Sequence, residues 1–123
     1  MGCDIHAFVE VQETGGWWRS AATLELNRWY RAFAELGGVR LDREWPHKTW
    51  RRGVPADVGS TARSAAADYA EDGHAHSWAT LEEIRELASN PEIDTYDYFN
   101  GIASAMSGIA MGRPVRLVFF FDN

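Results

Sequence analysis

The chain has 123 residues and a formal net charge of −6 at pH 7, which suits one compact domain over residues 1–123. Apolar residues make up 46% of the sequence and aromatic residues 13%, which excludes a disordered tail. The acidic balance argues against a long nucleic acid as partner, because its phosphates require a basic surface. The single cysteine excludes an internal disulfide and is typical of a reducing compartment.

No membrane segment is expected. No apolar run reaches the roughly twenty residues that span a bilayer. The start shows no basic segment followed by an apolar stretch, so no signal peptide is expected either. These features predict a protein of the cytoplasm that does not bind a membrane.

The first elements expected in chain order are the two strands of a hairpin. Residues 3–12, CDIHAFVEVQ, alternate between two faces, as strand residues do. The following ETGG is typical of a turn, and WWRSAATL can return as the second strand.

Helices are expected in the middle of the chain. The segment NRWYRAFAELGG predicts a helix that Asn27 caps and that the pair Gly37 and Gly38 ends. Residues 38–58 are interrupted by two prolines and look irregular.

Further helices are predicted over residues 60–69, after Thr80 and over residues 96–111. Thr80 and Glu83 form a capping-box pattern, which marks a helix start. The closing VRLVFFFDN predicts a strand. This order of elements predicts an α+β fold, with a mainly antiparallel sheet that contains the hairpin and the last strand, and three to four helices.

The first strand offers candidate site residues. Its alternation places Asp4, His6 and Glu10 on one face, where they can bind a metal or perform acid–base chemistry. An alternative of about equal weight is that this face is the solvated side of an antiparallel sheet. Cys3 points to the opposite face from His6, so it is expected to pack in the core and not to act as a nucleophile.

The segment DGHAHSW, just before a predicted helix, contains His74, His76 and Ser77. In an extended backbone both imidazoles of His-x-His point the same way, as metal sites often require. A helix start with a serine and a protonated histidine also favours an anion, although Glu82 and Glu83 in the first turn oppose it. The other interpretation is a polar loop that ends in a capping box.

A basic segment follows the first helix. Residues 38–52 carry five Arg or Lys and two acidic residues, so they sum to +3 and the remainder of the chain to −9. Arginine binds phosphate in a bidentate manner and tryptophan stacks on bases, so the segment suits a nucleotide-sized anion. A solvated loop that pairs with the acidic surface is an equal alternative.

The last strand can bring its polar residues close to those of the first strand. If it lies beside the first strand, Asp4, His6, Arg116 and Asp122 meet on one surface. The equal alternative is that Arg116 and Asp122 only terminate a core strand.

Several segments resemble a family of small bacteriophage and prophage proteins that has no established activity. The resemblance is carried by MGCDIH at the start, RWYRAFAELGGVR, RGVPADVG, HAHSWATLEE and VRLVFFFDN at the end. It runs through the chain in order and is weakest from about residue 90 to 112. It implies a phage accessory protein in the cytoplasm of a bacterial host cell. It also groups the residues inside the matching segments: Asp4, His6, Arg40, Asp57, His74, His76, Ser77, Trp78 and Asp122.

Three functions remain open from the sequence. The favoured hypothesis is a module that binds a small phosphate-bearing, nucleotide-like ligand and sequesters a signal of host immunity. Its predicted ligand-binding residues are Arg40, Trp45, Trp50, Arg51, Arg52, Ser77, Trp78 and Arg116.

The second hypothesis is a hydrolase of the phosphodiesterase type that acts on such a ligand. Its predicted catalytic residues are His74, His76, His6 and Asp4, and the same four are the predicted ligands of a divalent metal. The third hypothesis is an inhibitor that binds a host enzyme through tryptophan-rich surface. The sequence does not decide whether the protein is an enzyme, and it is compatible with a homo-oligomer.

Overall fold

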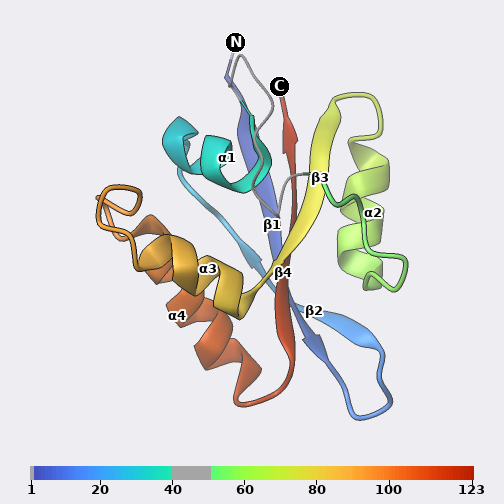
Figure 1. Ribbon diagram of the computed structural model, residues 1–123. Helices are drawn as coiled ribbons and strands as arrows, with labels where there is room; N and C mark the ends of the chain where they lie inside the picture. Colours follow the sequence, from blue (N-terminus) through green and yellow to red (C-terminus); the bar gives the residue numbers. More distant parts are fainter. Residues whose placement is uncertain (1, 40–50) are drawn as a thin grey trace.

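The computed structural model describes residues 2–39 and 51–123, and these form an α+β fold around one antiparallel sheet (Figure 1). The four strands lie in the order β2-β1-β4-β3. In chain order the elements are β1 (Asp4–Gln12), β2 (Trp18–Leu24), α1 (Tyr30–Gly37), α2 (Ser60–Asp68), β3 (Gly73–Thr80), α3 (Leu81–Ala88), α4 (Tyr98–Ala110) and β4 (Val115–Asp122). The predicted fold class is therefore confirmed.

The two central strands come from the two ends of the chain. β1 pairs with β4 along its length, with Asp4 opposite Asp122, His6 opposite Phe120 and Glu10 opposite Arg116. Directly paired residues point to the same face of a sheet. The first and last strands are therefore neighbours, a question that the sequence left open, and the polar residues of both strands share one face.

The larger core lies on the opposite face of the sheet. Helices α1, α3 and α4 cover this face (Figure 1), and their apolar side chains pack against alternate residues of β1 and β4. Cys3 is fully buried there, as predicted for a packing residue. We call this side the core face.

Helix α2 covers the second face of the sheet, where it forms a smaller apolar cluster with Phe8, Val118 and Phe120 (Figure 1). This cover explains why Glu10 is fully buried although it lies on the polar face of β1. We call this side the α2 face. It is not simply the solvated side of the sheet.

Two of the helix ends follow local signals of the sequence. Thr80 and Glu83 form the predicted capping box at the start of α3. Gly38 ends α1 with a left-handed φ of 66°. The predicted cap at Asn27 is wrong, because α1 begins at Tyr30 and its N-cap is Trp29, without a side-chain capping bond.

β3 is an element that the sequence did not predict, since the HAHSW segment was interpreted as leading into a helix. It pairs with β4 and forms the fourth strand of the sheet. In the described part of the chain, no helix is long and apolar enough to cross a membrane.

Candidate functional site: a tryptophan-lined cleft

A buried ion pair marks one end of the α2 face. Arg116 on β4 donates to the Glu10 carboxylate on β1 at 2.8 and 3.0 Å. Glu10 also accepts a hydrogen bond from the backbone N–H of Gly59, at 2.8 Å. Buried charges require such partners. The guanidinium of Arg116 is thereby fixed at the point where β4 begins.

Trp18 and Asp57 complete this cluster. The Arg116 guanidinium lies over the indole of Trp18, 4.0 Å from the ring centroid, and donates to Asp57 Oδ1 at 3.0 Å. Arg116, and to a smaller extent Trp18, hold the pKa of Asp57 below its usual range. Because the Asp57 side chain is 63% exposed, its carboxylate faces both the ion pair and solvent.

A cleft of about 660 Å³ opens above this cluster. It lies where β3 passes into α3 and where the connection from α4 enters β4. We call it the tryptophan cleft. The aromatic and charged residues that line it are Trp18, Asp57, Trp78, Glu82, Arg85, Arg113 and Arg116. Its volume is in the range of small-molecule sites, and aromatic walls with a few polar groups are typical of them.

Trp78 is held in the cleft by a second arginine. The guanidinium of Arg52 lies 4.4 Å from the centroid of the Trp78 ring and binds Glu83 with two hydrogen bonds, of 2.8 and 2.6 Å. Arg52 lowers the pKa of Glu83 to about 2. Arg52, predicted to hold phosphate, is therefore engaged with a carboxylate and positions a wall of the cleft.

Three arginines of the cleft differ in their pairing. Arg116 is occupied by Glu10 and Asp57, and Arg113 by Glu13 at 3.1 and 3.2 Å. Among residues 2–39 and 51–123, no ion pair or hydrogen bond engages the side chain of Arg85. Arg85 is exposed on α3 and is the cleft's available cation.

The other predicted ligand-binding residues have different positions. Trp78 and Arg116 line the cleft. The prediction that Ser77 binds the ligand is wrong, because Ser77 is fully buried and its hydroxyl accepts a hydrogen bond from the backbone N–H of Arg52 at 3.1 Å. Arg51 occupies an exposed turn with a φ of 52°. Arg40, Trp45 and Trp50 lie outside the described residues.

His74 and His76 do not point the same way. Ala75 between them has a φ of 53°, and the pairing of β3 with β4 shifts register between His74 and Ser77. This is a bulge, in which two residues oppose one. His74 pairs with Phe121 on the core face, whereas His76 stacks on Phe120 on the α2 face with ring centroids 5.1 Å apart. The expected parallel arrangement of the two imidazoles is wrong.

His6 forms a second polar cluster at the other end of the α2 face. Its Nε2 contacts the Asp122 carboxylate, and its ring lies 4.4 Å from that of Tyr69 and 4.9 Å from that of Phe120. His6 and His76 flank Phe120 from the two neighbouring strands, so their backbones are about 10 Å apart. Burial, and the nearby His74, lower the pKa of His76.

Asp4 is paired with a different residue. Arg28 donates to both of its carboxylate oxygens, at 2.6 and 3.0 Å, and lowers its pKa. The four predicted metal ligands are therefore not brought together. In residues 2–39 and 51–123, no group of three or more His, Cys, Asp or Glu side chains is arranged to hold a metal ion.

Sequence reasoning missed four residues of the cleft: Trp18, Arg85, Arg113 and the role of Asp57 beside Arg116. Trp17 and Trp18 are adjacent, and only the strand register decides which indole enters the cleft. Trp18 is opposite Gln12 and lines the cleft, whereas Trp17 is 58% exposed outside the strand. The alternation of strand residues in WWRSAATL was the available signal, but it does not show which of the two tryptophans belongs to which face of the strand.

Comparison with protein-family models, with curated protein sequences and with solved structures gave no match.

Proposed function

We propose that this protein binds a small nucleotide-like ligand in the tryptophan cleft and does not cleave it. One observation carries the proposal: strands from different parts of the chain place Trp18 and Trp78 in a single cleft with arginine side chains. Indoles stack on nucleobases without strong base preference, and guanidinium groups bind phosphate.

The charges of the cleft suggest a division of roles. Arg116 and Arg113 are neutralised by carboxylates, so phosphate binding is assigned to Arg85. The exposed Asp57 carboxylate can accept hydrogen bonds from ribose hydroxyls or base amino groups. The cleft thus suits a ligand with one aromatic ring, hydroxyl or amino donors and a compact anionic group.

The position of the histidines favours binding over hydrolysis. His6 is opposite Phe120, four residues along β4 from Arg116, which corresponds to about 13 Å. A general acid or base must lie within hydrogen-bonding reach of the reacting group, directly or through one water. Neither His6 nor His76 lines the tryptophan cleft, so neither imidazole lies beside a phosphate bound at Arg85.

The test is incubation with a panel of mono-, di- and cyclic nucleotides and ADP-ribose-type nucleotides, each with and without a divalent metal. Binding is measured by titration calorimetry, and the bound ligand is released by heat and analysed by chromatography. The proposal predicts binding by at least one compound and its recovery unchanged. No binding across the panel would contradict it.

A hydrolase is the second candidate, favoured by the contact between His6 and Asp122. A carboxylate beside an imidazole holds the ring in one orientation and tautomer. This function predicts loss of intact nucleotide during incubation, and loss of turnover in a His6→Ala or His76→Ala variant. Turnover that persists in both variants would remove this candidate.

The biological setting of the proposal comes from the family resemblance. A phage accessory protein in the host cytoplasm that captures a nucleotide would remove a signal of host immunity. A protein that binds and inhibits a host enzyme, alone or as a homo-oligomer, is the interpretation left if no nucleotide binds.

A further inference from the structure

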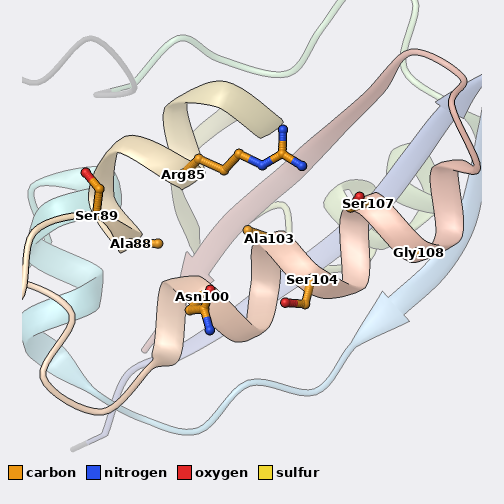
Figure 2. A pocket seen from close by; sticks show the side chains of 8 residues that line it. All are labelled: Arg85, Ala88, Ser89, Asn100, Ala103, Ser104, Ser107 and Gly108. Carbon is orange, nitrogen blue, oxygen red and sulfur yellow. The ribbon is translucent and has the colours of Figure 1, made fainter.

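A second depression lies between α3 and α4 (Figure 2). It has a volume of about 610 Å³, and Arg85 and Ser107 line both it and the cleft. In Figure 2 the Arg85 side chain extends along the groove toward the Ser107 end of α4. The two hollows are therefore adjacent, with Arg85 at the boundary that they share. We call the second one the α3–α4 groove.

The chemistry of the α3–α4 groove differs from that of the cleft. Its polar lining is made of neutral groups, namely Ser89, Asn100, Ser104 and Ser107, together with the charged Arg85. Within residues 2–39 and 51–123, no aromatic or acidic side chain lines it. Hydroxyl and amide groups both donate and accept hydrogen bonds, so they match a neutral group rich in hydroxyls.

The order of these sites along the surface selects a ligand class. Aromatic walls at Trp18 and Trp78 come first, then the Arg85 cation, then the neutral polar groove. A nucleoside diphosphate sugar has the same order, with a base, a diphosphate and a sugar. We infer that the ligand is a nucleoside diphosphate esterified to a sugar, with the base in the cleft, the diphosphate at Arg85 and the sugar in the groove. This inference rests on the proposed function and names the ligand class.

The test compares ADP with ADP-ribose and UDP with UDP-glucose by titration calorimetry. We expect the wild type to bind at least one sugar ester about tenfold or more tightly than the diphosphate alone, because the sugar adds hydrogen bonds in the groove. Ser104→Leu fills the groove from an exposed position of α4. It should abolish this preference and leave the affinity for the diphosphate unchanged.

Gly101→Leu is the matched control, since Gly101 is exposed on the same helix, has open space around its Cβ position and does not line the groove. It should keep the preference. Equal affinity for diphosphate and sugar ester in the wild type, or a preference that survives Ser104→Leu, would overturn this inference alone. If none of the four compounds binds, this inference is overturned, whereas the proposed function is overturned only if no compound of the wider nucleotide panel binds.

Discussion

At the scale of single residues, Glu10 and Arg116 set the position of the cleft. Their pair is almost fully enclosed, with side chains 0% and 9% exposed. Each is fixed by further bonds, Glu10 by the Gly59 N–H and Arg116 by Asp57. The pair also orients Trp18, whose ring stacks on the guanidinium. The stability of the fold and the shape of the site therefore depend on the same residues.

Glu10→Gln should destabilise the protein by about 3 kcal/mol, because removing one partner of a buried pair leaves a charge poorly compensated. The measurement is the free energy of unfolding in urea. Glu13→Gln is the matched control, since Glu13 pairs with two arginines that are substantially exposed. Its effect should be small. A Glu10→Gln protein as stable as the control would contradict the assigned role of the pair.

The lowered pKa of Glu83 makes the stability of the fold depend on pH in the acid range. The pKa of Glu83 in the fold is about 2, below the ordinary value of 4.5, because Arg52 binds its charged form. A lowered carboxyl pKa stabilises the fold above the unfolded-state pKa, and this stabilisation is lost as the pH falls toward 2. The free energy of unfolding of the wild type should therefore fall between about pH 5 and pH 2.

The Glu83→Gln variant should show a weaker dependence of stability on pH. The Glu82→Gln variant is the control, because Glu82 is exposed, and it should retain the dependence of the wild type. Urea unfolding at several pH values measures both slopes. Equal slopes for wild type and Glu83→Gln would show that the contact with Arg52 does not contribute to acid stability.

At the scale of the elements, the local signals of the sequence predicted most of the fold. Alternation predicted β1, and capping chemistry placed the start of α3 correctly. β3 was missed because a bulge at Ala75 interrupts its alternation. The burial of Glu10 was missed because it depends on α2, which covers that face from a distant part of the chain. Contacts between elements are not encoded in local periodicity.

The bulge makes its own prediction. Ala75 adopts a left-handed backbone that glycine occupies at lower cost, so Ala75→Gly should raise the free energy of unfolding by about 1 kcal/mol. Ala79→Gly is the control in the same strand, since Ala79 is fully buried in the regular part of β3. It should destabilise the protein. Thermal unfolding of both variants measures the two effects. Equal destabilisation by both substitutions would contradict the assigned cost of the left-handed backbone at Ala75.

At the scale of the whole molecule, the tryptophan cleft exists only in the folded chain. Trp18 comes from β2, Arg116 from β4, Trp78 from β3 and Arg85 from α3. The sequence indicated Trp78 and Arg116 but assigned phosphate binding to a neighbouring basic segment, because charge along the chain does not reveal which arginines carboxylates neutralise. The structure pairs Arg52 and leaves Arg85 as the available cation.

The assignment of Arg85 predicts that Arg85→Gln weakens binding of a phosphate-bearing ligand by about tenfold or more, since a charge-assisted hydrogen bond is lost. Arg63→Gln is the control, because Arg63 is also exposed on a helix but does not line the cleft. Calorimetric titration at fixed salt concentration compares the two. Equal affinities would contradict the role of Arg85.

The proposed function requires that the ligand stacks on an indole in the tryptophan cleft. The most direct test is a titration of the tightest-binding nucleotide against Trp18→Ala and Trp17→Ala, with circular dichroism to verify folding. Because stacking on an indole contributes about 1–3 kcal/mol, Trp18→Ala should lose about tenfold or more in affinity. Trp17→Ala, which changes an exposed indole outside the cleft, should bind like the wild type. Equal affinity of both folded variants would contradict stacking of the ligand on Trp18.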